Sequence, residues 1–168
     1  MPTLLLLRHL KSSWDDESLA DHDRPLSARG VRDGGHVAEH LQSLNAPVDL
    51  VLCSSAVRTR QTLELIQPAL GHAPVEIEDQ LYGASADTLL ARLHGVPDSV
   101  GSALMIGHNP GMQDLVLHLA APGPIRTAVV AKYPTGALAT LALPDHTWLA
   151  VQQGTARLIG YTVPKDLR

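Results

Sequence analysis

Three segments of the chain place arginine or histidine directly after a short apolar run. Arg8 and His9 follow the first run, Arg58 follows a second, and His108 follows a third. A guanidinium fork binds phosphate oxygens, and a neutral imidazole nitrogen beside it can attack phosphorus. The residue types at these positions therefore indicate phosphoryl chemistry with a histidine nucleophile.

Each of these residues alone has an ordinary explanation. A lone histidine at a strand end is usually structural, and a single arginine in the first turn of a helix is usually a surface ion-pair partner. The joint pattern is more specific, because two arginines and two histidines would form one positive pocket in a chain of net charge −4. We interpret Arg8, His9, Arg58 and His108 as one catalytic set.

The four residues need a sheet that brings its strand ends to a common edge. Short Leu- and Val-rich runs alternate with helical patterns, which predicts an α/β fold with a mostly parallel central sheet between helices. The expected strands cover residues 3–7, 49–53, 74–77 and 103–106. Side chains just beyond the carboxyl ends of such strands line a crevice.

The expected helices begin at cap residues between these strands. Ser27 caps a helix that runs to about Leu44, and its buried stripe is expected at Val31, Val37, Leu41 and Leu44. Further helices are expected after residues 54–55 as far as Pro68, after Ser85 with leucines 89, 90 and 93 facing inward, and after Asn109-Pro110.

The C-terminal third has a different pattern. Residues 136–143 and 147–151 are expected to form an antiparallel edge hairpin through the turn at 144–146. Residues 156–163 are expected to form another edge strand that ends at Pro164.

Composition narrows the class of protein. With 168 residues and 45% hydrophobic residues, we expect one domain over residues 1–168. The single cysteine, Cys53, excludes a disulfide-stapled module. The net charge of −4 and 3% aromatic content argue against nucleic-acid and anionic-membrane partners. The early apolar run at 4–7 is too short for a signal peptide or a membrane span, so a cytoplasmic location is expected.

Four motifs occur in a fixed order along the chain. They are Leu7-Arg8-His9 with Lys11-Ser12-Ser13-Trp14, Asp21-His22-Asp23-Arg24-Pro25-Leu26, Ser54-Ser55 leading to Arg58, and Gly107-His108-Asn109-Pro110-Gly111. Together they resemble the histidine phosphatase superfamily, and within it the SixA-type phosphohistidine phosphatase branch. The resemblance implies a three-layer α/β/α fold of the phosphoglycerate mutase type without a cap insertion.

The resemblance also implies roles for individual residues. His9 would be the nucleophile, transiently phosphorylated, while Arg8, Arg58 and His108 surround the phosphoryl oxygens without a metal or cofactor. We expect His9 to be neutral, its other ring N–H held by a backbone carbonyl, and His108 to be protonated opposite a phosphoryl dianion. The candidate substrate-binding residues are Lys11, Ser12, Arg24 and Asn109.

The sequence departs from the superfamily pattern in two ways. Leu10 stands where many members have glycine after Arg-His, and Asn109 stands where acid-phosphatase-like members have aspartate. No carboxylate after the third strand aligns with the glutamate of mutase-like members, because Glu78, Asp79 and Asp87 all fit poorly. A site without a positioned acid suits the labile P–N bond of phosphohistidine better than an alkoxide leaving group.

The resemblance favours a metal-independent phosphatase that acts on a histidine phosphotransfer protein of a signalling relay. A small-molecule phosphomonoesterase of the same fold is the first alternative, favoured if the loop at 83–87 closes over the pocket and supplies an acid. A non-catalytic module that binds phosphorylated ligands is the second. The acidic segment at 15–23 is either a solvated loop or a rim that selects a partner.

Overall fold

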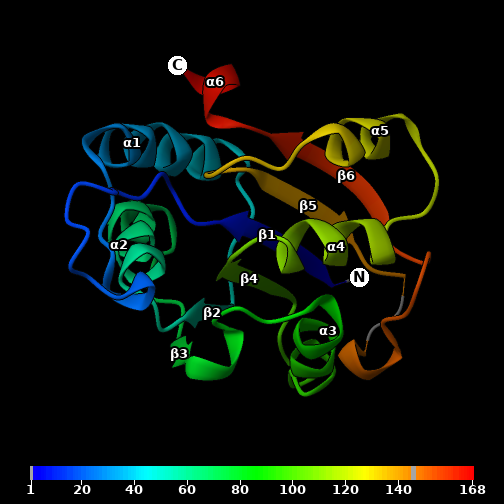
Figure 1. Cartoon of the computed structure of the whole chain (residues 1–168). Coiled ribbons are helices and arrows are strands. Elements are labelled where there is room, and N and C mark those ends of the chain that lie inside the picture. Colours follow the sequence, from blue (N-terminus) through cyan, green and yellow to red (C-terminus); the bar gives the residue numbers. More distant parts are fainter. Residues whose placement is uncertain (1, 145–146) are drawn as a thin grey trace.

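The computed structural model describes residues 2–144 and 147–168. Its six strands are β1 Thr3–Arg8, β2 Leu50–Ser54, β3 Val75–Glu78, β4 Ser102–Gly107, β5 Leu138–Ala142 and β6 Arg157–Thr162. They form one sheet in the order β3-β2-β4-β1-β5-β6 (Figure 1). The first four strands in that order are parallel, whereas β5 and β6 run antiparallel to their neighbours. The predicted α/β fold with a mostly parallel sheet is confirmed.

Helices cover both faces of this sheet. They are α1 Ala28–Ser43, α2 Val57–Ile66, α3 Ala86–His94, α4 Gly111–Leu119, α5 Pro124–Ala131 and the short α6 Pro164–Leu167. Successive β1 side chains point to opposite faces, so Leu5 and Leu7 pack in the core under α1 and α2, and Leu4 and Leu6 pack in the core under α3 and α4. Within the described residues, no helix is long and apolar enough to cross a membrane.

Helix α1 begins where the sequence predicts but faces the core differently. The Ser27 hydroxyl accepts a hydrogen bond from the Gly30 N–H at 3.1 Å, as expected of an N-cap. Val31 and Leu44, however, are exposed. The helix instead approaches the loop after β1 through Gly30, where a Cβ would lie 2.2 Å from the Lys11 carbonyl oxygen. This close approach turns Val31 to solvent.

The other helix starts agree in part. Ser85 caps α3 as predicted, accepting from the Thr88 N–H. Neither serine at 54–55 occupies the N-cap position of α2, which falls on Ala56 without a side-chain cap. Helix α4 begins one residue later than Asn109-Pro110 predicts, although the Asn109 side chain still accepts from the Gln113 N–H at 3.2 Å.

The predicted hairpin over residues 136–151 is wrong. Residues 138–142 do form β5, but its antiparallel partners are β1 and β6, and Trp148–Ala150 forms a 3-10 helix. Trp148 is fully buried in the core that includes the α3 residues Leu89 and Leu93, and its indole N–H donates to the Val100 carbonyl at 2.8 Å, so the segment does not join the sheet. Two residues of the predicted turn, 145 and 146, lie outside the described residues. The strand predicted at 156–163 is confirmed as the edge strand β6.

Candidate active site

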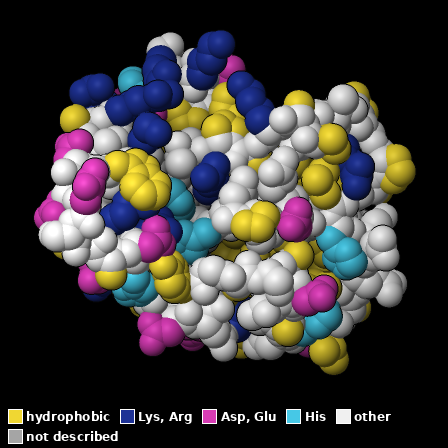
Figure 2. Space-filling model, viewed as in Figure 1, with side chains coloured by type: hydrophobic (Ala, Val, Ile, Leu, Met, Phe, Trp, Pro, Cys, Tyr) yellow, Lys and Arg dark blue, Asp and Glu magenta, His cyan; other side chains and the backbone are white. Residues whose placement is uncertain are grey.

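Parallel pairing brings the two candidate histidines together. Arg8 at the end of β1 pairs with Gly107 at the end of β4, and the His9 N–H donates to the Gly107 carbonyl at 3.0 Å. The ring centroids of His9 and His108 are 5.2 Å apart. Figure 2 shows histidine side chains in a hollow over these strand ends, with Lys and Arg above it and Asp and Glu beside it. Parallel pairing therefore brings Arg8, His9 and His108, three members of the predicted catalytic set, together at the carboxyl ends of β1 and β4.

His9 is held in a single tautomer. Its Nδ1 lies 2.7 Å from the Leu10 carbonyl oxygen, which only accepts, so Nδ1 carries the proton and Nε2 keeps a free lone pair. Burial lowers the pKa of His9 to about 3, and the charges of Arg58 and Arg8 act in the same direction. A neutral imidazole with one free nitrogen is the form that attacks phosphorus.

His108 is positioned from β2. Its Nε2 lies 2.7 Å from the Ser54 hydroxyl oxygen. Burial lowers the pKa of His108 to about 4, and the charges of Arg58 and Arg8 also lower it. His108 is thus neutral among these cations at pH 7, and the protonated form expected from the sequence needs the opposing charge of a phosphoryl dianion.

Two buried polar atoms at this edge have no hydrogen-bond partner within the described part of the chain. They are Arg8 Nε and His108 Nδ1. The Arg8 guanidinium donates elsewhere through Nη1, to the Tyr133 carbonyl at 2.9 Å. Buried polar groups are nearly always paired, so two that lie on residues flanking His9 indicate a place for a ligand oxygen.

Asp21 organises the cations on the other side of the hollow. Its carboxylate accepts from Arg24 Nη1 at 3.0 Å, from Arg58 Nη2 at 3.0 Å and from the Tyr82 hydroxyl at 2.5 Å. Arg58 Nη1 also donates to the Asp21 carbonyl at 2.7 Å. The hydrogen bond from Tyr82 is the largest cause that lowers the pKa of Asp21 to about 2, and Arg58 and Arg24 add to it. Asp21 stays ionised and fixes the direction of the Arg58 fork.

Sequence reasoning missed both Asp21 and Tyr82. In the sequence, Asp21 belongs to the acidic segment at 15–23, and its place in the same motif as Arg24 is the signal that points to it. The Tyr82 ring lies edge-on to His108 with centroids 5.4 Å apart, and also edge-on to His22 at 4.8 Å. Tyr82 follows β3, in the region whose carboxylates do not align with the glutamate of mutase-like members.

Those carboxylates remain outside the site. Glu78 accepts two hydrogen bonds from Arg92 Nε, at 2.7 and 2.9 Å. Asp79 and Asp87 are exposed on the 3-10 helix after β3 and on the first turn of α3. The structure therefore brings none of the three into contact with the candidate histidines.

The four predicted substrate-binding residues fall into different environments. Arg24 is buried, with its Nη2 donating to the Ser12 hydroxyl at 2.7 Å and its guanidinium stacked on the exposed Trp14 ring. Asn109 donates through Nδ2 to the Tyr133 carbonyl at 2.9 Å. Lys11 is exposed. Ser12 and Asn109 are thus engaged in hydrogen bonds with residues around the hollow. Arg24 is connected to Arg58 through the Asp21 carboxylate, which both guanidinium groups contact.

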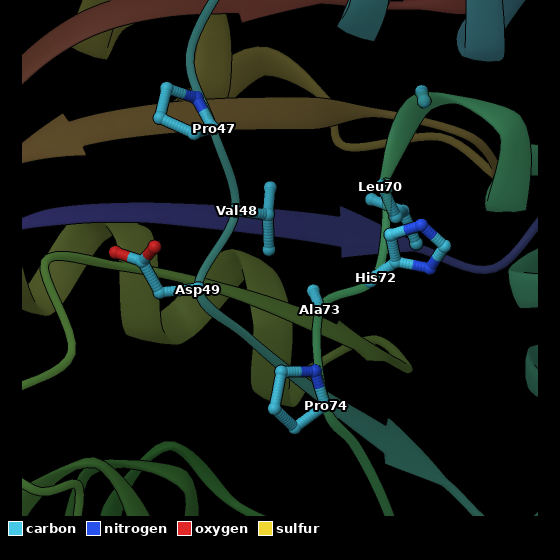
Figure 3. A pocket seen from close by; sticks show the side chains of 9 residues that line it. Pro47, Val48, Asp49, Leu70, His72, Ala73 and Pro74 are labelled. Atoms are coloured by element: carbon cyan, nitrogen blue, oxygen red, sulfur yellow. The ribbon is translucent and has the colours of Figure 1, made fainter.

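A second concavity lies at the other end of the parallel strands, where β2 and β3 begin. It has a volume of about 430 Å³ and is lined by the segments that precede β2 and β3 (Figure 3). Its titratable side chains are Asp49 and the exposed His72, and Asp49 Oδ2 already accepts from the N–H groups of Gly101 and Ser102. It lacks the converging cations of the first hollow. Among the described residues, no group of three or more His, Cys, Asp or Glu is arranged to hold a metal ion.

Lowering the pH from about 7 to about 5 is expected to reduce the free energy of unfolding. The folded-state pKa values of His9 and His108, about 3 and about 4, lie below the unfolded value of about 6.5. Their neutral rings therefore stabilise the fold fully above pH ~6.5, and that stability is lost as the pH falls towards the folded values, at up to about 1.4 kcal/mol per pH unit for each ring.

Urea unfolding followed by circular dichroism across this pH range measures how steeply the free energy of unfolding changes with pH. Carboxylates with lowered pKa, such as Asp21, lose their contribution only below about pH 4, so the two histidines dominate the window. His108→Asn should reduce the slope, and His72→Asn, at an exposed position, should not. An unchanged slope in His108→Asn would contradict the burial argument.

Comparisons with known proteins identify the family of the chain. The family model described as the histidine phosphatase superfamily (branch 1) matches residues 4–98. An uncharacterised protein of Mycobacterium tuberculosis is 38% identical over 167 residues, covering 95% of this chain and 100% of the relative.

Two similar solved structures are candidate phosphohistidine phosphatases SixA. The one from Nakamurella multipartitia is 31% identical with a TM-score of 0.85, and the match covers 97% of this chain and 96% of the other. The one from Agrobacterium tumefaciens is 28% identical with a TM-score of 0.84, covering 98% and 99%. The chain belongs to the histidine phosphatase superfamily.

Proposed function

We propose that this protein hydrolyses a phosphoryl group through a covalent phosphohistidine intermediate on His9, with phosphohistidine on a phosphotransfer protein as its substrate. The observation that carries the proposal is the state of His9. Its Nδ1 is held by the Leu10 carbonyl, its pKa is low, and Arg8 and His108 beside it each present a buried polar atom without a partner within the described chain. A neutral nucleophile in a cationic cradle matches the charge that phosphoryl transfer develops on the equatorial oxygens.

The reaction takes two balanced steps. In the first, His9 Nε2 bonds to phosphorus while the P–N bond of the substrate breaks, and the leaving imidazole takes up a proton from solvent. In the second, water bonds to phosphorus while the P–N bond to His9 breaks, which releases inorganic phosphate and a proton and restores the free lone pair. Arg8 and Arg58 stabilise the transferring oxygens in both steps. No metal ion is required for either step in this proposal.

Within residues 2–144 and 147–168, none of the carboxyl groups named above is placed to donate a proton to a leaving group, and this supports phosphohistidine as the substrate. Glu78 is engaged by Arg92, and Asn109 cannot donate as an acid. Protonating an alkoxide leaving group by a positioned acid is typically worth about 10²-fold to 10⁴-fold in rate. A phosphorylated imidazole is a better leaving group and depends less on this assistance.

Rapid-quench labelling tests the proposal. The protein is mixed with a ³²P-labelled phosphohistidine peptide or with a labelled aryl phosphate, quenched in alkali, and digested to locate the label. We expect label on His9 that appears and decays with turnover, and faster turnover of the peptide. Faster turnover of the aryl phosphate would favour the small-molecule phosphomonoesterase, and phosphate binding without label or release would favour the binding module.

A further inference from the structure

A strip of exposed cations extends from the mouth of the hollow across the neighbouring helices. Its members are Lys11, Arg29, Arg32, Lys132, Lys165 and Arg168. They come from the loop after β1, the first two turns of α1, the end of α5 and the C-terminal α6. Figure 2 shows Lys and Arg side chains gathered along this side of the molecule, above the histidine-lined hollow.

Backbone contacts make the strip continuous with the candidate site. The Ser27 N–H donates to the Lys11 carbonyl at 2.9 Å, which places the start of α1 beside the loop that follows His9. The Gly136 N–H donates to the His9 carbonyl at 2.9 Å, and Gly136 also lies against Pro164 at the start of α6. The strip therefore begins at the loop that follows His9.

A second set of contacts joins α6 to α1. Arg168 donates to Asp33 through Nε at 3.0 Å and through Nη2 at 2.9 Å. Asp33 is buried and also lies 3.9 Å from Arg29. One buried carboxylate thus anchors two cations of the strip while leaving Arg32 and Lys165 exposed to solvent.

The net charge of the strip is positive, whereas the net charge of the whole chain is negative. The chain has a net charge of −4, whereas the strip combines six cations with two carboxylates, Asp33 and Asp166. Acidic residues 15–17 and 23 lie on the loop that carries Asp21, and Figure 2 shows Asp and Glu side chains beside the hollow, apart from the gathered Lys and Arg side chains above it. A partner surface that covers the mouth therefore meets positive charge on one side and negative charge on the other.

We propose that this strip docks an acidic face of the protein substrate, next to the phosphorylated side chain. The inference rests on the proposed function and adds the charge of the substrate surface to it. A phosphoryl group alone is accommodated by Arg8, Arg58 and His108, so it gives no reason for cations that reach as far as Arg168. A folded protein can carry acidic and basic patches side by side, whereas a nucleic acid would place phosphates against the acidic loop as well.

Two synthetic phosphohistidine peptides of equal length test the docking surface. One carries glutamates around the phosphohistidine and the other carries lysines, and p-nitrophenyl phosphate serves as a substrate without flanks. We expect kcat/KM to be about threefold to tenfold higher for the glutamate peptide at low salt, with the preference shrinking as salt screens it. The double variant Arg32→Glu/Lys165→Glu should remove or reverse the preference while turnover of p-nitrophenyl phosphate stays unchanged.

The matched control is Arg60→Glu/Arg157→Glu, which reverses two exposed cations outside the strip and should leave the preference intact. Equal kcat/KM for the two peptides, or an unchanged preference in the strip variant, would overturn the docking proposal. The proposed function would not be affected by that result if turnover of p-nitrophenyl phosphate were normal. If the unaltered protein turned over none of the three substrates, the proposed function would be rejected instead. A single-stranded oligonucleotide that competes as strongly as an unphosphorylated glutamate peptide of equal charge would overturn the assignment to a protein partner.

Discussion

His9→Asn is expected to reduce turnover of p-nitrophenyl phosphate by at least about 10³-fold. The amide cannot act as a nucleophile towards phosphorus, whereas the cationic cradle of Arg8, Arg58 and His108 is retained. Binding of orthovanadate, measured by isothermal titration calorimetry, should therefore persist in the variant. Initial-rate kinetics with p-nitrophenyl phosphate and with a phosphohistidine peptide measure the loss.

His72→Asn is the matched control for this experiment. His72 lies in the concavity at the amino-terminal ends of the parallel strands, on the segment that precedes β3 (Figure 3), and the same substitution there should leave kcat/KM unchanged. Turnover in His9→Asn within about tenfold of the unaltered protein would remove His9 as the nucleophile, provided that circular dichroism shows an intact fold.

Arg58→Ala is expected to lower kcat by about 10²-fold to 10³-fold. The Arg58 guanidinium is buried and held by Asp21, so under the proposed function we expect it to stabilise the developing charge on phosphorus without having to reorganise. Because that charge is greatest in the transition state, kcat should fall more than KM rises. Arg60→Ala, two residues along the same helix at an exposed position, should change neither constant.

Asp21→Asn extends this prediction to the positioning of Arg58. Asparagine keeps the shape of the side chain but removes the charge that holds Arg58 and Arg24, so kcat should fall by about tenfold to 100-fold. The double variant with Arg58→Ala should lose little beyond Arg58→Ala alone, since the positioning has no effect once the fork is absent. Additive losses in the double variant, or a loss of equal size in Asp23→Asn, would show that Asp21 does not act through Arg58.

Much of the fold follows from local features of the sequence. The parallel strands β1, β2 and β4 are short apolar runs separated by helical patterns, and such runs mark strands covered on both faces. The expectation of a strand buried on both faces is wrong for β3, whose residues Val75–Glu78 lie at the edge of the sheet with Val75 and Ile77 exposed. The predicted hairpin failed because residues 147–151 are apolar enough for a strand, yet Trp148 is drawn into the core beside α3. Local pattern alone does not distinguish a strand from an apolar segment that packs against a helix.

The sequence by itself determined which residues could perform the chemistry. Arg8, His9, Arg58 and His108 each follow an apolar run, and the carboxyl ends of parallel strands meet at one edge of a sheet, so their convergence depended only on the fold class. The fold class follows from the alternation of strand and helix patterns along the chain, and that alternation is a local property of the sequence.

Only the tertiary structure decided how those residues are held and what surrounds them. The Leu10 carbonyl that fixes the His9 tautomer, the Asp21 carboxylate that aims Arg58, and the Tyr82 ring against His108 are contacts between atoms whose separation depends on loop paths. The cationic strip likewise appears only when α6 packs on α1 through Arg168 and Asp33. Residues far apart in sequence become neighbours through the packing of the whole chain, and no local pattern specifies those distances.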